Sequence, residues 1–283
     1  MNDTSSLRES WTTTGYVTLD GLFGEPELAD AESAVGDWAA RQMEDWSGTP
    51  YTGANFKTDF YSAWQAAGKP PFRRSPVRNL THPRFYAFLR SKALLDLVGA
   101  VLQTDEISVH GIFNARPMLP GAAPTPWHQD AQYWREHGEP DAGNPALRRR
   151  VVSVWIPLQD LDPELGGLEI ASLDATQRVL FDDHYREAES ALLSIEPEKI
   201  AGLTGEIPLL RRGGAIAFTP LTVHRGTPNR AQRIRWSVDV RYEATDGAMV
   251  SGRKYGFIAR SGSGRYAEDS LETWRARCIG NLT

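Results

Sequence analysis

Apolar and polar residues alternate without interruption in Ile234-Arg235-Trp236-Ser237-Val238-Asp239-Val240-Arg241-Tyr242. Successive side chains of a strand point to opposite faces, so this pattern predicts a half-buried β-strand. Earlier runs separated by Gly- and Pro-rich turns also predict strands, at residues 107–117, 151–159, 168–172 and 215–219. Several short strands after a helical N-terminal third predict a mainly β fold with helices: a double-stranded β-helix, or cupin-like jelly roll, with the N-terminal helices packed outside.

The N-terminal third has helical periodicity. After an opening strand at residues 16–23, apolar residues recur at near-helical spacing from Glu27 to about Trp46. Another helix is expected to begin at Thr81-His82-Pro83 and to reach Leu102. Residues 47–77, rich in Gly, Pro and Tyr, are expected to form a loop that contributes to an active-site lid.

No linker interrupts the chain, so we expect one domain over residues 1–283. Its expected parts are a helical region at 1–105, a jelly-roll core at 106–245 and a C-terminal segment at 246–283 that wraps the outside or covers the mouth of the barrel.

Composition restricts the class of protein. The residues are 41% apolar and include nine tryptophans, enough for a substantial core with aromatic surface left for a ligand cavity. A net charge of −5 and one short basic cluster at residues 148–150 predict no nucleic-acid partner. With Cys278 as the only cysteine, no signal peptide and no apolar run of membrane-spanning length, we expect a cytoplasmic protein without a membrane partner. The sequence does not distinguish a monomer from a homodimer.

Metal-binding residues are predicted in the stretch Pro126-Trp127-His128-Gln129-Asp130. On an extended strand, His128 and Asp130 would point to the same face and could reach one ion. A third ligand, His224, lies far along the chain on another predicted strand. Two imidazoles and one carboxylate with open positions opposite them are the ligand set of non-haem Fe(II) oxygenases. Arg235, on the next strand, is suited to bind a carboxylate through its guanidinium group.

Together these motifs resemble the phytanoyl-CoA hydroxylase-like family of Fe(II)- and 2-oxoglutarate-dependent dioxygenases. That family has a Trp/His-Gln-Asp stretch, a Trp-x-Pro/Ala-Leu strand, a Gly-Gly-like turn, a distal His and an Arg eleven residues after it. The likeness covers roughly residues 10–245, and this sequence supplies Trp127-His128-Gln129-Asp130, Trp155-Ile156-Pro157-Leu158, Gly166-Gly167, His224 and Arg235.

The resemblance implies cofactors and a reaction. Fe(II) would be held by His128, Asp130 and His224, and 2-oxoglutarate would chelate the iron and place its distal carboxylate on Arg235. The class uses O2, decarboxylates 2-oxoglutarate to succinate and oxidises an unactivated C–H bond of a substrate. Because the carboxylate ligand is present, hydroxylation is expected rather than halogenation, and desaturation, epimerisation or ring formation remain open.

Three further assignments each keep an alternative. Arg233 lies two positions before Arg235 and competes with it for the carboxylate, although the family register favours Arg235. Thr227 is a candidate contact for 2-oxoglutarate, but relatives have their hydroxyl residue one position earlier, where this chain has Gly226. Trp155 is either close to the cofactor or a core tryptophan of a buried strand.

Residues for substrate contact are predicted only from their proximity to these motifs. Gln132, Tyr133 and Trp134 follow the metal motif directly, and Tyr61 lies in the expected lid. Each of them is equally suited to packing or to a solvated loop. The remaining imidazoles are expected at the surface or satisfied in the core, and include His110, His137 and His184.

The function predicted from the sequence is therefore an Fe(II)- and 2-oxoglutarate-dependent dioxygenase acting on a small molecule, in a tailoring step of natural-product or antibiotic biosynthesis. An acyl-CoA substrate would favour a basic surface for its phosphates, and the acidic net charge argues against it. Two other classes remain open: a metal-dependent cupin-like isomerase or hydrolase without a cosubstrate, and a non-catalytic jelly-roll binding module.

Overall fold

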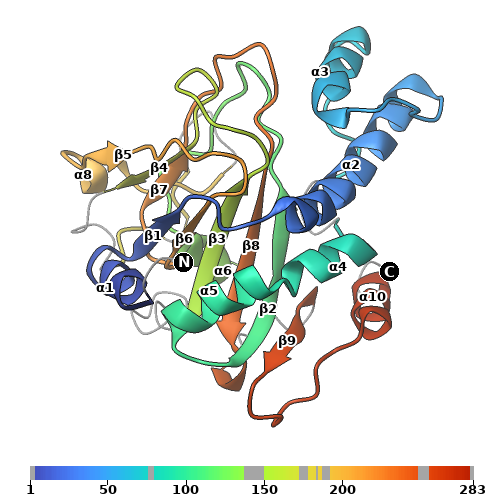
Figure 1. Ribbon diagram of the computed structural model, residues 1–283. Coiled ribbons are helices and arrows are strands. Elements are labelled where there is room, and N and C mark those ends of the chain that lie inside the picture. The colour runs from blue at the N-terminus through green and yellow to red at the C-terminus, as the bar shows by residue number, and fades with distance from the viewer. Residues whose placement is uncertain are drawn as a thin grey trace.

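The computed structural model describes residues 4–75, 80–136, 150–171, 178–182, 184–186, 192–247 and 255–280. Its centre is a six-stranded antiparallel sheet (Figure 1), whose strands follow the order β1 (Tyr16–Leu19), β6 (Ala215–Phe218), β3 (Val151–Pro157), β8 (Ser237–Ala244), β2 (Glu106–Ala115) and β9 (Phe257–Ser261). A smaller antiparallel sheet has the order β5 (Gly205–Glu206), β4 (Leu168–Ala171) and β7 (His224–Gly226). The predicted jelly roll with helices is confirmed.

The two faces of the large sheet differ in chemistry, as the alternation along β8 predicts. Val238, Val240 and Tyr242 join the N-terminal helices in one hydrophobic cluster. Asp239 and Arg241 are also buried but lie on the opposite, inner face. The outer face is covered by helices (Figure 1), among them α2 (Glu25–Ser47), α4 (Pro83–Leu89) and α5 (Lys92–Leu102). Apolar packing on the outer face therefore leaves the inner face free to carry polar groups.

Helix α2 begins and ends at capping residues. The Glu27 side chain accepts a hydrogen bond from the backbone N–H of Gly24 at 3.1 Å, which satisfies an amide that the helix cannot. At the other end Gly48 has φ +74°, and its N–H donates to the Glu44 carbonyl. The helix predicted for residues 27–46 is confirmed.

Helix α3 (Phe56–Ala66) contradicts the loop predicted around it. The sequence predicts a loop for residues 47–77, but α3 lies within them, so that prediction is wrong. Phe56 and Phe60, one helical turn apart, pack edge-on against Trp236 with ring centroids 5.1 and 5.3 Å away. Short helices depend on tertiary packing more than on intrinsic propensity, and this aromatic contact supplies it.

The helix predicted from Pro83 to Leu102 is also corrected, because the chain leaves the helical conformation between α4 and α5. Ser91 has ψ +141°, an extended conformation that starts a new helix axis at Lys92. The cap predicted at His82 is present: its Nδ1 accepts a hydrogen bond from the Arg84 amide at 3.2 Å. The opening strand is shorter than predicted and ends at Leu19.

The C-terminal segment extends the large sheet and then packs on its outside. Strand β9 pairs with β2 at the sheet edge. The indole of Trp274 contacts Phe257 and Tyr86 of α4, which places the last helix beside α4 (Figure 1). The single-domain organisation stays a prediction. The other elements are α1 (Thr4–Thr14), α6 (Asp130–Glu136), α8 (Pro197–Ile200), η2 (Thr245–Gly247) and α10 (Leu271–Gly280).

Among the described helices, none is both long and apolar enough to cross a membrane. Two sequence expectations, for His137 and for residues 148 and 149 of the basic cluster, fall outside the described residues.

Candidate metal centre

The three predicted metal ligands come together on the smaller sheet. His224 begins β7, and His128 pairs with it as an added bridge: the amide of each donates to the carbonyl of the other at 3.0 Å. Asp130 is the first residue of α6 rather than part of a strand, so the predicted extended His128–Asp130 geometry is wrong. The side-chain amide of Gln129 fixes this turn, since it donates to the carbonyls of Arg178 and Leu221.

The ring orientation of both histidines is set by backbone carbonyls. Nδ1 of His128 lies 2.9 Å from the Pro126 carbonyl, and Nδ1 of His224 lies 2.9 Å from the Thr222 carbonyl. A carbonyl can only accept, so each Nδ1 carries the proton and each Nε2 presents a lone pair. The two Nε2 atoms lie 3.9 and 4.0 Å from Asp130 Oδ1. All three candidate ligand atoms are within 4.8 Å of one another, so they can face a single ion.

The protonation states suit a divalent cation. Burial lowers the pKa of His128 to about 3 and also lowers the pKa of His224, which keeps both imidazoles neutral at pH 7. Burial alone would raise the pKa of Asp130, but the charge and hydrogen bonds of Arg241, together with the two neighbouring histidines, outweigh this and hold that pKa well below its usual range. The site therefore presents two neutral nitrogens and one ionised oxygen, a donor set that fits Fe(II).

Arg241 is a functional residue that the sequence analysis missed. Its Nε donates to Asp130 Oδ2 and its Nη2 to Oδ1, both at 3.0 Å, and the Ser153 hydroxyl donates to Oδ2 at 2.5 Å. Two of these three donors occupy Oδ2, while Oδ1 is the oxygen that faces the histidines. The sequence contains a signal for this residue: in the alternating strand pattern, Arg241 falls on the same face as Arg235, which was already a candidate.

Arg235 lies in the same cavity with its guanidinium incompletely bonded. Its Nη1 donates to the carbonyls of Gly167 and Thr227 at 3.0 and 3.1 Å, but its buried Nε has no partner. No carboxylate of the described residues forms an ion pair with Arg235, and burial lowers its pKa to about 10. A buried, unpaired guanidinium fits an incoming carboxylate. Its competitor Arg233 is half-exposed and forms an ion pair with Asp162.

Thr227 supports this guanidinium through the backbone. Its hydroxyl accepts a hydrogen bond from the Gly167 amide at 2.7 Å, which fixes the two carbonyls that hold Arg235. The turn requires glycine at residue 166: φ is +70°, and a Cβ there would lie 2.5 Å from Thr227 Oγ1. The role of Thr227 as a direct contact of 2-oxoglutarate stays a prediction.

A cavity of about 70 Å³ lies between the two sheets, and its lining includes the three candidate metal ligands, Arg235 and Arg241. Trp155 lines it, directly across the strand pair from Asp239, so the indole is at the site as well as in the core. Phe218 also lines the cavity, and its ring packs on His224 with centroids 4.5 Å apart. The remaining charged lining residue is Arg116, which follows β2.

The residues predicted for substrate contact do not line this cavity. Gln132 is fully buried, and its side-chain amide donates to the carbonyls of Asp182 and Ser194. Trp134 stacks on His110. The remaining two lie elsewhere: Tyr133 packs edge-on against the His128 ring, and Tyr61 borders a separate hollow next to residues 120–124. Their roles in substrate binding stay predictions.

The other described histidines do not join the metal group. His110 is fully buried and His184 is exposed, as the sequence analysis expects of residues outside the site.

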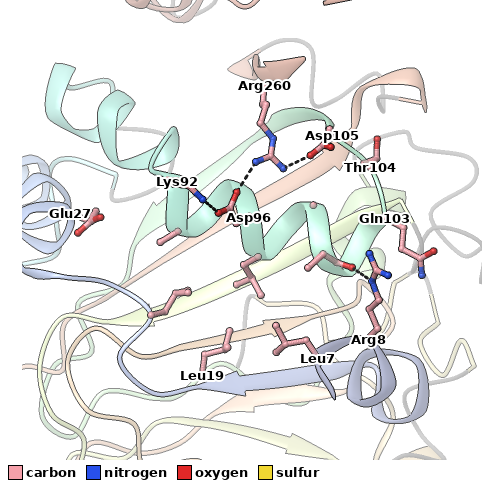
Figure 2. Close-up of a pocket in the computed structure, with 15 residues that line it drawn as sticks. Leu7, Arg8, Leu19, Glu27, Lys92, Asp96, Gln103, Thr104, Asp105 and Arg260 are labelled. Carbon is pink, nitrogen blue, oxygen red and sulfur yellow. Dashed lines mark hydrogen bonds and ion pairs between the residues drawn. The ribbon is translucent and has the colours of Figure 1, made fainter. Parts of the chain in front are cut away.

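A larger groove, of about 890 Å³, lies away from the metal group between α1, β1 and α5 (Figure 2). Its charged side chains are already bonded within the protein. Arg260 binds Asp96 and Asp105, Lys92 also binds Asp96, and Arg8 donates to the Ala100 carbonyl (Figure 2). Among the described residues that line it, this groove offers neither a metal-ligand cluster nor an unpaired charge, so the smaller cavity is the candidate active site.

Comparison with known proteins agrees with this geometry. A family model described as Phytanoyl-CoA dioxygenase (PhyH) matches residues 11–237. No curated protein sequence matches the chain. A similar solved structure is that of EctD from S. alaskensis with 2-oxoglutarate and 5-hydroxyectoine, at 16% identity and a TM-score of 0.59, covering 96% of this chain and 88% of that chain.

Two further structures are similar to this chain over nearly its whole length. EvdO2 from Micromonospora carbonacea var. aurantiaca, complexed with 2-oxoglutarate, has 19% identity and a TM-score of 0.57, with 96% of this chain and 97% of that chain covered. SnoK, a non-heme alpha ketoglutarate dependent carbocyclase from nogalamycin biosynthesis, has 15% identity and a TM-score of 0.57, with 95% of each chain covered. At these identities the likeness shows a shared fold.

Proposed function

The chain belongs to the phytanoyl-CoA dioxygenase family, and on that premise we propose that it oxidises an unactivated C–H bond of a small molecule, with hydroxylation as the expected outcome. It is an oxygenase, and its cofactors are Fe(II), 2-oxoglutarate and O2. The observation that carries the proposal is the presence, in one buried cavity, of an open His-Asp-His group and an unpaired arginine.

The metal ligands in this proposal are His128 Nε2, His224 Nε2 and Asp130 Oδ1. When bound, Fe(II) and 2-oxoglutarate activate O2 and couple decarboxylation of the keto acid, to succinate and CO2, to oxidation of the substrate. His128, His224 and Asp130 would hold the ion through these three donors, and no fourth protein ligand is found among the described residues. Arg241 and Ser153 keep Asp130 ionised and oriented, so that one oxygen faces the ion.

Arg235 is proposed to bind the distal carboxylate of 2-oxoglutarate. A zinc hydrolase or a cupin-like isomerase has no need for an unpaired guanidinium beside its metal, whereas a dicarboxylate cosubstrate does. The buried Nε atom without a partner supports this assignment. The guanidinium also stays charged at pH 7, because its lowered pKa of about 10 is still well above neutrality.

We place the reaction in a tailoring step of natural-product biosynthesis. The support for this is the similarity in fold to SnoK, which is named for nogalamycin biosynthesis. The net charge of −5 provides no basic surface for the phosphates of an acyl-CoA substrate.

The decisive experiment measures succinate release from 2-oxoglutarate with Fe(II) and ascorbate. The parent protein should release succinate, and His128→Ala or Asp130→Ala should abolish the release by loss of iron. Arg235→Ala should raise the 2-oxoglutarate concentration needed for half-maximal rate by at least about tenfold, because a charged hydrogen bond contributes roughly 1.5–3 kcal/mol.

Arg233→Ala is the matched control, since that arginine is half-exposed and paired with Asp162 at the surface. It should leave the 2-oxoglutarate requirement unchanged. No succinate release by the parent would favour an isomerase, a hydrolase or a binding module, and equal 2-oxoglutarate dependence in the Arg235 variant and the parent would move the carboxylate contact to another residue.

A further inference from the structure

Asp239 is a charged residue of the cavity that neither the metal nor the cosubstrate assignment uses. It lies on β8 between Arg235 and Arg241, and its side chain is 9% exposed. Arg116 binds it with two nitrogens that converge on the same oxygen: Nε lies 2.9 Å and Nη2 2.8 Å from Oδ2. The other oxygen, Oδ1, is buried and has no hydrogen-bond partner among the described residues.

This arrangement differs from that of a structural ion pair. Arginine that stabilises a buried carboxylate does so best with two parallel bonds, one to each oxygen, as Arg241 does for Asp130. The pair formed by Arg116 and Asp239 instead leaves a buried acceptor unsatisfied, which is unfavourable for folding unless a ligand completes it. The Arg116 side chain is 44% exposed, and its Nη1 takes no part in the pair, so this nitrogen is available as a donor to a ligand.

The subsite adjoins the metal group. Arg241 Nη2 lies 3.7 Å from Asp239 Oδ2 and 3.0 Å from Asp130, so one guanidinium separates the open carboxylate from a metal ligand. A group bound to Asp239 would therefore share one cavity with the three candidate metal ligands. The carbon atoms next to that group would be presented for oxidation.

Charge restricts the class of ligand. Three arginines and two carboxylates line the cavity, a net charge of one positive with neutral histidines. Fe(II) and a doubly ionised 2-oxoglutarate cancel each other, so the excess remains when both are bound. An ammonium group at Asp239 would meet the repulsion of Arg116 and Arg241. A neutral hydroxyl can donate to the open oxygen without that penalty.

We propose that Asp239 and Arg116 form the substrate-orienting subsite, and that the substrate is a neutral molecule with oxygens on neighbouring carbons. A substrate hydroxyl donates to Asp239 Oδ1, and the adjacent oxygen accepts a hydrogen bond from Arg116. This inference rests on the proposed function, because it places the subsite beside the iron and the 2-oxoglutarate of that function.

The test is the binding of three matched probes to protein loaded with 2-oxoglutarate and with Zn(II) as a redox-inert substitute for iron. The probes are trans-cyclohexane-1,2-diol, its dimethyl ether and trans-cyclohexane-1,2-diamine, and their dissociation constants are measured by NMR titration. The diol should bind at least about tenfold more tightly than the ether, which cannot donate, and more tightly than the cationic diamine.

Asp239→Asn should weaken diol binding by about tenfold or more, because the amide turns its oxygen to Arg116 and offers a donor where the substrate needs an acceptor. Arg116→Met, at the half-exposed end of the pair, is the second variant in case the buried substitution does not fold. Asp162→Asn is the matched control, since Asp162 also pairs with an arginine, Arg233, but at the surface, and it should leave diol binding unchanged.

Binding of 2-oxoglutarate, followed in the same samples, reports on the proposed function separately. If the parent protein binds no 2-oxoglutarate, the proposed function fails. If it binds 2-oxoglutarate but does not bind the diol, or binds diol and ether equally, or keeps its diol affinity in Asp239→Asn and Arg116→Met, the hydroxyl subsite is overturned while the proposed function stands.

Discussion

Replacing Arg241 with methionine tests whether the protein itself neutralises its metal-binding carboxylate. Arg241→Met keeps the length of the aliphatic chain but removes both hydrogen bonds to Asp130, each 3.0 Å long, and the only guanidinium in contact with that carboxylate among the described residues. Both side chains of the pair are nearly inaccessible to solvent, at 6% and 4% exposure. The variant therefore leaves a buried charge with only the Ser153 hydroxyl as a donor.

Removing one partner of a buried ion pair costs about 3–5 kcal/mol. The entropy of unfolding of a chain of this size is about 0.6 kcal/mol per kelvin, so the loss corresponds to a fall in melting temperature of about 5–8 °C. Differential scanning calorimetry in the presence of EDTA measures this fall. Arg233→Met is the matched control, because its ion pair is exposed and should change the free energy of unfolding by less than about 1 kcal/mol.

The pH dependence of the same variant identifies the cause. With Arg241 present, the pKa of Asp130 lies below its unfolded value, so the pair contributes stability above that value and loses it as the pH falls. Without Arg241, burial raises the pKa of Asp130, and the folded protein gains stability as the pH falls and the carboxyl binds a proton. The difference in melting temperature between parent and variant should therefore become smaller from pH 7 towards pH 4. A melting temperature within 1–2 °C of the parent at pH 7, or a difference that does not depend on pH, would refute this account of Arg241.

Further predictions concern the histidines and the glycine turn. In metal-free protein, folded His128 binds fewer protons than an unfolded histidine between pH 6.5 and about 3, so stability should fall as the pH drops below 6.5. From pH 7 to pH 5, His128 alone should lower the free energy of unfolding by about 2 kcal/mol, and His224 should act in the same direction. A free energy of unfolding in urea and EDTA that does not change over this pH range would contradict this. Gly121→Ala, at φ +70° with open space around it, should cost about 1 kcal/mol, whereas Gly166→Ala, at the same φ, should cost about 2 kcal/mol more because its Cβ meets Thr227. Only the Gly166 variant should weaken 2-oxoglutarate binding in calorimetric titration, and equal effects of both substitutions would show that the close contact is relieved.

The sequence was sufficient to predict the strands of the sheet from short-range alternation, and the three metal-ligand candidates from the short His128–Asp130 motif together with the distant His224. Alternation along β8 separates an apolar outer face from a polar inner face, and that separation alone determines which side packs on helices. The positions of His128, Asp130 and His224 agree with the expected convergence even though Asp130 starts a helix rather than continuing a strand.

The residues after the metal motif show where proximity in sequence fails. Because α6 starts at Asp130, Gln132 lies about 200° around the helix axis from it and turns away from the cavity. Tyr133 and Trp134 return to the side of Asp130, but their rings pack on His128 and His110 and do not line the cavity. Helix α3 was missed for a different reason. Phe56 and Phe60 form too short a periodic pattern to be distinguished from a loop in the sequence, and only the fold shows that both rings pack on Trp236.

Strand β8 and the two residues before it explain why one short segment can serve the metal, the cosubstrate and the substrate. Residues two apart on a strand share a face and lie about 6.8 Å from each other, so Arg235, Asp239 and Arg241 are spread along the cavity in that order. The charge of Arg241 is paired with that of Asp130. Asp239 is paired with Arg116, but only one of its two oxygens takes part. Among the described residues, the unsatisfied atoms of these three side chains are Nε of Arg235, Oδ1 of Asp239 and Nη1 of Arg241. The first is suited to an anion and the second to a hydroxyl. Because Arg235 and Asp239 lie four residues apart, with Asp239 on β8 and Arg235 two residues before it, substitutions at Arg235 should affect the cosubstrate and those at Asp239 the substrate, each without the other.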